Sequence, residues 1–433
     1  MDLYIMNPKL EIIKVVDSAS SVIWTRRYNE AGDFEVYIKA NDAILEHMQP
    51  DNYIKRFDSD MAVIIEKPQL VTDPEEGDYY TITGQDLKSL LKRRVVWMPA
   101  YNVSGTVKEC VNKILTDNVI NPAEASRKIN NFIIGDYKIT DYTIQAQYTG
   151  ADIYELIVEI CKTYNLGWNI KINDNKQFEF YMYEGANRSY AQDKNDFVVF
   201  SNDFENLVTT EYVYDKSALK NAALIGGEGE GSWRRMHSIG SASDANRREM
   251  FVDASNITSD TGIDVTESFS VSSEDGYRDF TNYIYSINSV TVEGEKTDNY
   301  VFNKPPWENR RVFFGGLEPD RKYNSSTGKV ERVEKLYNIT VTYRKAYSPA
   351  EYNALLAQRG YEELAKIQIT EGLSGEVDST RQYVVDRDFF LGDIVQVKNE
   401  YGLQAQPRII EIMECEDSDG ISVIPTFTTW EVV

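Results

Sequence analysis

A glycine-rich stretch, LIGGEGEGSWRR at 224–235, has the composition closest to that of a phosphate-binding loop. A phosphate loop needs Gly, four residues and then Gly-Lys-Ser/Thr, so that backbone amides and a lysine surround the phosphates. Here Glu228 and Glu230 stand between the glycines and would repel a phosphate, and no lysine precedes Ser232. No helical periodicity follows, so the dinucleotide pattern fails too. We expect no nucleotide, and we interpret the stretch as an extended crossing, with glycines for close backbone approach and glutamates facing solvent.

Histidines and carboxylates do not form a catalytic pattern. Only His47 and His237 are present, so a zinc site or a Ser-His-Asp triad would rest on one or two residues. The DSDG at 417–420 lacks the later glutamate of a calcium loop, because Pro425 occupies that position. Nothing singles out a carboxylate pair for glycoside cleavage among 69 acidic residues. We therefore expect no catalytic, cofactor-binding or metal-binding residues, and a protein that is not an enzyme.

The three cysteines, Cys110, Cys161 and Cys415, have no metal-ligand spacing. Cys110 and Cys161 fall on the apolar faces of expected helices, which indicates buried, reduced thiols in a reducing compartment. The first 20 residues have neither a basic start nor a long apolar core, so we expect no signal peptide. No apolar run approaches the roughly 18 residues of a membrane helix.

Length and charge limit the number of domains and the kinds of partner that the chain can have. A chain of 433 residues is long enough for two to four domains, and its many Tyr, Val, Ile and Thr favour strands. Lys and Arg number 46 against 69 Asp and Glu, so the formal net charge is −23. Such a surface does not attract nucleic acid or anionic lipid. It indicates either simple solubility or a wall that nucleic acid passes without sticking.

The first hundred residues are typical of a small β-barrel. Two strands flank a turn at 29–33, and in the second Phe34, Val36 and Ile38 alternate with polar residues. A further hairpin spans 61–84. A short helix follows at 85–94, which we expect to cap the barrel. Its apolar stripe is Leu87, Leu90 and Leu91, and its basic end is Lys92, Arg93 and Arg94, where the helix dipole favours positive charge.

Helical periodicity appears at three later places. The first helix, at 104–118, has an apolar face of Val107, Cys110, Val111 and Ile114. The second, at 149–168, has Thr149 and Asp152 as a capping pair and Gly167 as its stop. The third, at 348–372, has Ser348 as its cap, Pro349 in its first turn and an apolar face of Tyr352, Leu355, Leu356 and Leu364.

These elements predict a β-rich α+β chain in which two small β-barrel domains each carry an inserted module. The expected ranges are 1–100 plus 186–225 for the first barrel, 101–185 for its inserted α/β module, 226–265 plus 374–433 for the second barrel, and 266–373 for an inserted β-rich module with the long helix.

Four motifs in this order resemble the tail hub proteins of siphophages: IWTRRYNEAGDFEVYI, YYTITGQDLKSLLKRRVV, ALIGGEGEGSWRR and DRDFFLGDIVQVKNEYG. That family is similar to the baseplate hub of contractile tails and to the N-terminal part of tail-associated lysins. The resemblance runs from about residue 10 to residue 428 and implies a baseplate-hub-like fold. It also implies a homotrimeric ring at the virion tail tip, made in the host cytoplasm, that joins a distal tail or tube protein to a fibre, spike or tape measure protein and lets DNA pass.

Two alternatives stay open at this point. One is a tail-associated enzyme that degrades polysaccharide or cell wall, although we expect no peptidase or glycosidase domain after the last expected strands before Val433. The other is the hub of a contractile, phage-like injection particle. Neither stable nucleic-acid binding nor membrane insertion by this chain itself is expected.

Overall fold

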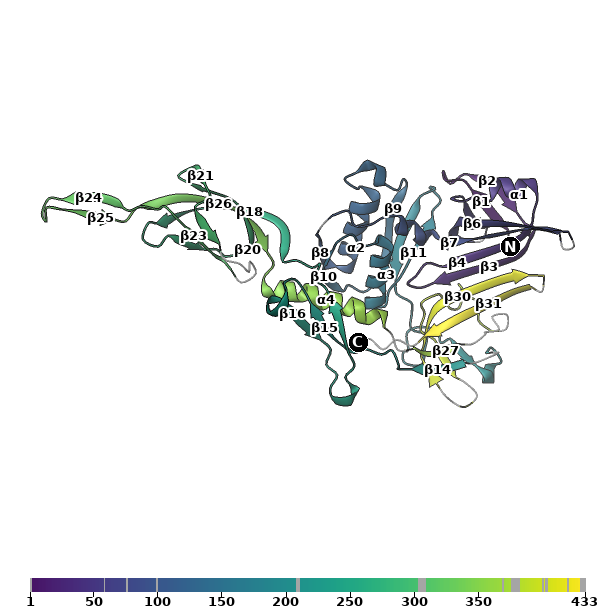
Figure 1. Cartoon of the computed structure of the whole chain (residues 1–433). Coiled ribbons are helices and arrows are strands. Elements are labelled where there is room, and N and C mark those ends of the chain that lie inside the picture. The colour runs from purple at the N-terminus through teal and green to yellow at the C-terminus, as the bar shows by residue number, and fades with distance from the viewer. Residues whose placement is uncertain are drawn as a thin grey trace.

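The computed structural model describes residues 2–57, 59–74, 77–98, 100–207, 211–302, 309–367, 370–374, 382–398, 401, 404–418 and 420–428. The molecule is elongated (Figure 1), with a large sheet at one end, a helical module beside it, and a β-rich arm that extends to the other end.

A nine-stranded sheet contains strands from both halves of the chain. In order across the sheet these are β2 (Ile12–Val16), β1 (Leu3–Met6), β5 (Tyr53–Arg56), β6 (Ala62–Asp73), β7 (Gly77–Asp86), β4 (Asp33–Lys39), β3 (Ala19–Arg27), β30 (Arg408–Asp417) and β31 (Gly420–Thr428). The alternation expected in β4 is confirmed, because Phe34, Val36 and Ile38 are buried. A short helix, α1 (Asp42–His47), follows β4. The β-rich class is therefore confirmed, whereas β2 and β31 are the two edges of an open sheet and the closed barrels stay a prediction.

The α/β module follows the 3-10 helix η1 (Leu87–Arg93). Its elements are β8 (Tyr101–Thr106), α2 (Val107–Leu115), the π-helical turn η2 (Thr116–Ile120), the 3-10 turn η3 (Ala125–Arg127), β9 (Phe132–Lys138), β10 (Thr143–Tyr148), α3 (Ile153–Tyr164), β11 (Gly167–Ile172) and β12 (Phe178–Tyr183). Thr106 and Glu109 form a capping box on α2. Asp152 alone caps α3, and Asn165, at φ 57°, ends it in the left-handed conformation expected of Gly167, which instead begins β11.

The packing of η1 differs from the prediction. Leu87, Leu90 and Leu91 are buried, as expected, but they belong to the hydrophobic core of the α/β module rather than to the interior of the N-terminal sheet. The separate core of that sheet contains residues such as Leu3, Ile5 and Val36. The helix therefore joins the sheet to the module, because α3 and β11 supply the apolar surface that its leucines cover.

The strands after the module do not extend the N-terminal sheet. β13 (Val199–Ser201) pairs with β28 (Gln396–Lys398), which also pairs with β29 (Gln404–Ala405), and β14 (Glu211–Asp215) pairs with β27 (Thr370–Ser374). β15 (Ala222–Gly226) pairs with β16 (Met236–Ile239) and β17 (Glu249–Asp253). The strands of 186–225 thus pair outside that sheet, and the expectation that they complete the first barrel stays a prediction. In their place β30 and β31 extend the sheet, while the inner face of β15 packs against helix α4 (Pro349–Lys366).

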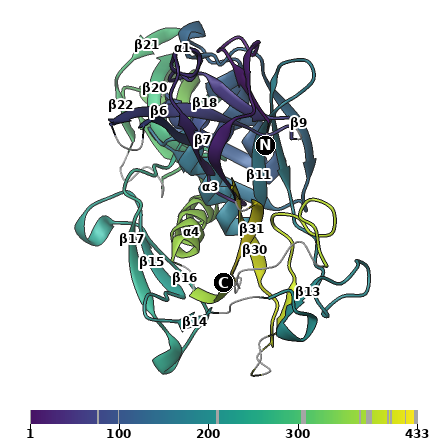
Figure 2. The ribbon, with the colours of Figure 1, turned by 90° about the vertical axis from the view of Figure 1, so that its right-hand side faces the viewer.

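Helix α4 begins and packs as predicted. Ser348 and Glu351 form its capping box, and Pro349 is its first residue. Its buried residues include Tyr352, Leu355, Leu356 and Leu364. Figure 2 shows this helix beside the β15–β17 sheet.

The arm is built from two sheets and a terminal ribbon. A four-stranded sheet contains β18 (Asp260–Ser272), β26 (Leu336–Ala346), β20 (Tyr283–Val292) and β21 (Glu295–Thr297). A second sheet contains β19 (Tyr277–Asp279), β23 (Arg311–Phe314) and β22 (Tyr300–Phe302). The ribbon is the hairpin of β24 (Asp320–Asn324) and β25 (Lys329–Val333), whose turn lies in the YNSSTGK segment at 323–329.

Candidate functional site

The turn between β3 and β4 is the point where three parts of the chain meet. Tyr28, fully buried, donates from its hydroxyl to the carbonyl oxygen of Asn165, at 3.1 Å, and accepts from the backbone N–H of Gly185, at 3.3 Å. Burial raises the pKa of Tyr28 to about 12, so the hydroxyl keeps the proton it donates. We call this contact region the Tyr28 junction.

Two glycines let the backbone approach the Tyr28 ring. A Cβ atom at Gly167, in β11, would lie 2.2 Å from the Cε2 atom of the ring, and one at Gly392 would lie 2.3 Å from the same atom. Gly392 also has a φ of +96°, which side-chain-bearing residues rarely adopt. The Arg408 guanidinium lies 5.3 Å from the ring centroid, within the range of a cation–π contact. The N-terminal sheet, the α/β module and the C-terminal segment are thus held around one side chain.

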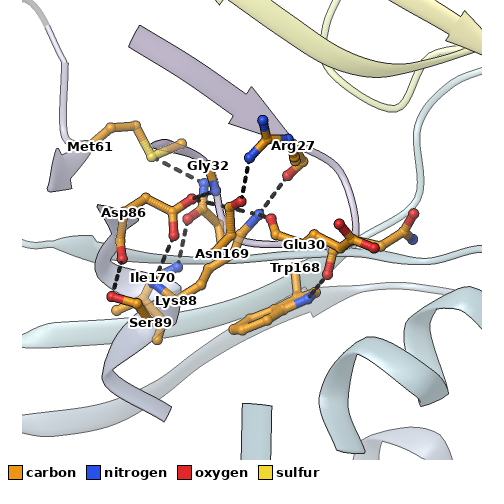
Figure 3. A network of polar contacts seen from close by, with 12 residues as sticks. Arg27, Glu30, Gly32, Met61, Asp86, Lys88, Ser89, Trp168, Asn169 and Ile170 are labelled. Atoms are coloured by element: carbon orange, nitrogen blue, oxygen red, sulfur yellow. Dashed lines mark hydrogen bonds and ion pairs between the residues drawn. The ribbon is translucent and has the colours of Figure 1, made fainter. Parts of the chain in front are cut away.

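A buried lysine reinforces the junction (Figure 3). Lys88 is 1% exposed, and its Nζ donates to the carbonyl oxygens of Arg27 and Glu30. Asp86 lies 3.9 Å from the same nitrogen and accepts from the backbone N–H of Gly32, at 2.8 Å. Burial lowers the pKa of Lys88 and raises the pKa of Asp86. The amine therefore ties down a turn whose carbonyl oxygens would otherwise be buried without a donor.

The module side of the junction is equally well bonded. The indole N–H of Trp168 donates to the carbonyl oxygen of Asn29, and the Asn29 amide donates to the carbonyl oxygen of Leu166, at 2.7 Å. The backbone N–H of Ala31 donates to the hydroxyl of Tyr154, at 2.9 Å. These contacts fix the orientation of the module against the sheet. Sequence reasoning missed them, since Lys88 falls within the short helix expected at 85–94 and Trp168 at the end of the helix expected at 149–168, and neither pattern indicates a polar contact.

A groove of about 700 Å³ opens beside the Tyr28 junction. Arg26 lies 2.9 Å from Asp386, and Arg188 lies 2.7 Å from Asp393. The ring of Phe390, 41% exposed, lies under the Arg188 guanidinium. The lining thus carries both signs of charge and an exposed aromatic ring, which is chemistry for contacting a polar partner.

Two carboxylates of the groove are paired with cations. Asp386 and Asp393 lie against arginines. Among the described residues, no group of three or more His, Cys, Asp or Glu side chains is placed to hold a metal ion. Also within the described part of the chain, no helix is long and apolar enough to cross a membrane.

The glycine stretch is a hairpin turn, not the extended crossing that we expected. β15 and β16 pair antiparallel across it, with Gly226 opposite Met236. The close approach of the backbone is confirmed: a Cβ atom at Gly227 would lie 2.5 Å from the hydroxyl of Tyr352, and Gly229 has a φ of +96°. β15 pairs antiparallel with β16 on one side and parallel with β17 on the other, and the antiparallel pairing requires the chain to reverse its direction at the glycine stretch.

Glu228 does not face solvent, contrary to the prediction. Its carboxylate lies 3.3 Å from the Arg235 guanidinium and accepts from the backbone N–H of Ser259, at 3.0 Å. Arg235 in turn lies over the ring of Tyr352, 3.7 Å from its centroid. The second glutamate, Glu230, is exposed as expected. The charged residues of this stretch therefore anchor the hairpin to α4.

The histidines lie on separate elements. His47 ends α1, and His237 lies on β16, where it is half-buried. Asp417 ends β30 and Gly420 begins β31, so the DSDG segment joins two paired strands.

The cysteines are free, and Cys110 and Cys161 are buried as predicted, whereas Cys415 is half-buried. Burial raises the pKa of the Cys110 thiol to about 11 and raises that of Cys161 as well. A raised thiol pKa opposes formation of the reactive thiolate, so these two side chains serve the core.

The basic end of η1 has partners within the chain. Lys92 donates to the Gln85 side chain, at 2.8 Å, and Arg93 pairs with Asp51, at 2.8 Å. Arg94 donates to the carbonyl oxygen of Arg127. These contacts place the three cations beside acceptors of their own chain.

The chain matches a known protein family. The model of the family described as Siphovirus ReqiPepy6 Gp37-like protein matches residues 2–428. No curated protein matches the chain in sequence.

Solved structures give a likeness of fold. A tail protein from Neisseria meningitidis MC58 is 11% identical with a TM-score of 0.50, over 99% of this chain and 96% of that one. The 43 kDa tail protein of prophage MuSo2 from Shewanella oneidensis is 10% identical with a TM-score of 0.49, over 99% and 98%. Prophage tail protein gp18 from Listeria monocytogenes EGD-e is 13% identical with a TM-score of 0.38, over 85% and 99%.

Proposed function

Because this chain belongs to the Siphovirus ReqiPepy6 Gp37-like protein family, whose members are phage tail proteins, we propose that it is the hub of a phage tail tip. In this proposal three copies form a ring in the virion. The observation that carries the proposal is the family match, which spans almost the whole chain rather than one module. The fold likeness to a solved tail protein supports it.

The architecture suits a rigid ring component. The nine-stranded sheet and the Tyr28 junction hold the two ends of the described chain in one body, with the α/β module between them. In our proposal, 101–185 and 266–373 are the two inserted modules, and the remaining strands form the two barrel-like parts that line the ring. The junction would keep these parts at a fixed angle while the tail transmits force.

The net charge supports a conduit for DNA. Duplex DNA carries one negative charge per about 1.7 Å, so a lumen of like charge would repel it and hinder sticking. The chain carries −23. We propose that the ring joins a distal tail or tail tube protein to a fibre, spike or tape measure protein. It would neither bind nucleic acid stably nor insert into the membrane.

Two tests address the ring and its place in the virion. Light scattering of the purified full chain should give a mass near three times 49.6 kDa. Antibodies against the chain should decorate the tail tip in electron micrographs of the virion. A protein that stays monomeric when concentrated would overturn the ring, and decoration of the capsid or tail shaft would overturn the hub.

Catalysis is the weaker candidate, carried only by the groove. The pairing of Asp386 and Asp393 with arginines favours a role in contact over a role in proton transfer. We propose that the chain is not an enzyme, and release of soluble sugar or peptide from cell wall or capsule by the purified protein would refute this. Absence of a sheath from the virion would separate a flexible tail from a contractile particle.

A further inference from the structure

The ribbon of β24 and β25 has no core of its own. At the far end of the arm (Figure 1) it projects as two strands, and in these strands eight of the ten residues are exposed. Tyr323 is 69% exposed and Val330 is 64% exposed. An isolated two-stranded hairpin is marginally stable in water, because it buries almost no apolar surface. A ribbon of this kind gains stability when a second surface covers it.

The turn fixes which side chains share a face. The Asn324 carboxamide oxygen accepts from the backbone N–H groups of Ser326, at 2.9 Å, and Thr327, at 3.3 Å, and Gly328 has a φ of +66°. With the register held in this way, Arg321 pairs with Arg332, and Tyr323 pairs with Val330. Side chains alternate between faces along a strand, so these four lie together, and we call them the arginine face.

The arginine face is electrostatically incomplete. Residues directly opposite each other in an antiparallel pair have Cβ atoms about 5 Å apart, and like charges there are destabilising. Among the described residues, no carboxylate pairs with Arg321 or Arg332. On the opposite face, by contrast, Lys322 lies across from Glu331. Two cations beside an exposed tyrosine are therefore suited to contact with an acidic surface from outside the arm.

The chain itself carries the complementary charge. Residues 320–335 carry five basic and three acidic side chains, a local charge of +2, on a chain with a net charge of −23. We propose that the arginine face docks on an acidic surface of a second copy of this chain, so that the arm of one copy reaches its neighbour. This inference deepens the proposed hub function, on which it rests only for the presence of several copies.

A matched pair of variants tests the charge complementarity. R321E/R332E reverses the arginine face, and K322E/K329E makes the same change of net charge on the opposite face of the same ribbon. We expect R321E/R332E to weaken self-association at least about tenfold in sedimentation equilibrium at low salt, since it removes charge-assisted contacts. We expect less than about a threefold effect from K322E/K329E. Equal effects of the two pairs would overturn the inference.

A cross-linking experiment locates the contact directly. Tyr323→p-benzoylphenylalanine places a photo-crosslinker on the arginine face of the full chain, and isotopically heavy and light copies are mixed before irradiation. We expect cross-linked peptides that join a heavy copy to a light copy at acidic segments. Cross-links found only within one copy would overturn the inference.

The outcomes separate this inference from the proposed function. Wild-type trimers that neither pair of substitutions weakens would overturn the docking and leave the hub intact. A wild-type chain that stays monomeric would overturn both. Salt-sensitive binding of the chain to a short DNA duplex, lost in R321E/R332E and kept in K322E/K329E, would replace the second copy with nucleic acid as the occupant.

Discussion

Replacing Lys88 with methionine tests whether the Tyr28 junction is held by its buried amine. Methionine keeps much of the aliphatic volume of lysine and removes the three N–H donors. The carbonyl oxygens of Arg27 and Glu30 then lose the donor that the structure gives them. Asp86 loses the nearby cation but keeps its two backbone donors, the N–H groups of Gly32 and residue 88.

The expected cost follows from these losses. A buried acceptor left without its donor costs about 1–3 kcal/mol. Two such carbonyl oxygens, together with a carboxylate that loses its nearby ammonium group, give a loss of about 3–5 kcal/mol, partly offset because a buried charge no longer has to be desolvated. Lys92→Met is the control on the same 3-10 helix. Lys92 is exposed and donates to one side chain, so its loss should cost about 1 kcal/mol or less.

Hydrogen exchange is the appropriate assay, because a chain with several hydrophobic cores does not unfold in a single step. The free energy of opening is measured for peptides that cover residues 28–32 and 165–170 in the wild type and both variants. We expect a large loss in Lys88→Met and a small one in Lys92→Met. Equal losses would show that the amine contributes nothing beyond the packing of its stem, and the reasoning would fail.

The pH dependence supplies an independent check. The folded chain lowers the pKa of Lys88 below its ordinary value of 10.5, so between the two values the unfolded chain binds more protons. Local stability at the junction should therefore rise with pH, from the lowered pKa up to 10.5, by a contribution that Lys88→Met lacks. The difference between wild type and variant isolates this contribution from that of the tyrosines, which titrate in the same range.

Three further predictions concern other parts of the chain. Gly227→Ala should destabilise the β15–β16 hairpin by more than Gly231→Ala, because a Cβ atom at 227 meets the Tyr352 hydroxyl at 2.5 Å, whereas one at 231 meets no atom and costs only the strain of its left-handed φ of +56°; equal melting temperatures would contradict this. A thiol reagent at pH 8 should modify the half-buried Cys415 first and the two buried cysteines only after denaturation, and Cys415→Ser should abolish the early phase. Millimolar ATP or NAD should leave the melting temperature unchanged, because the glycine stretch is a hairpin anchored to α4, and a shift of several degrees would refute that reading.

Local patterns predicted much of the fold. The cap at Ser348, the apolar stripes of α2 and α4 and the alternation in β4 each act over a few residues, and the structure confirms all of them. Each depends on interactions between residues that are close together in the sequence. The capping pair expected of Thr149 and Asp152 is wrong, because Asp152 alone caps α3. The end of α3 was placed two residues late, because asparagine can adopt the left-handed conformation that we assigned to glycine.

Long-range pairing could not be derived in the same way. The free edge of a strand such as β3 can pair with any strand in which apolar and polar residues alternate suitably. Only the three-dimensional arrangement of the chain determines that β30, and not β15, pairs with β3. The polar junction was hidden for a similar reason. Lys88 stands among basic residues in the sequence, and its burial depends on carbonyl oxygens contributed by a turn some 60 positions earlier.

The pairing of β3 with β30 has a consequence for synthesis of the chain. About 380 residues separate the end of β3 from the start of β30. A ribosome adding about 5–20 residues per second needs roughly 20–80 s to cover that distance, so the β3 edge emerges long before its neighbour exists. An unpaired strand edge is prone to wrong pairing with other chains. The nascent tail protein must therefore be shielded during this interval, and conditions that slow translation should lower its soluble yield more than that of proteins whose sheets are completed locally.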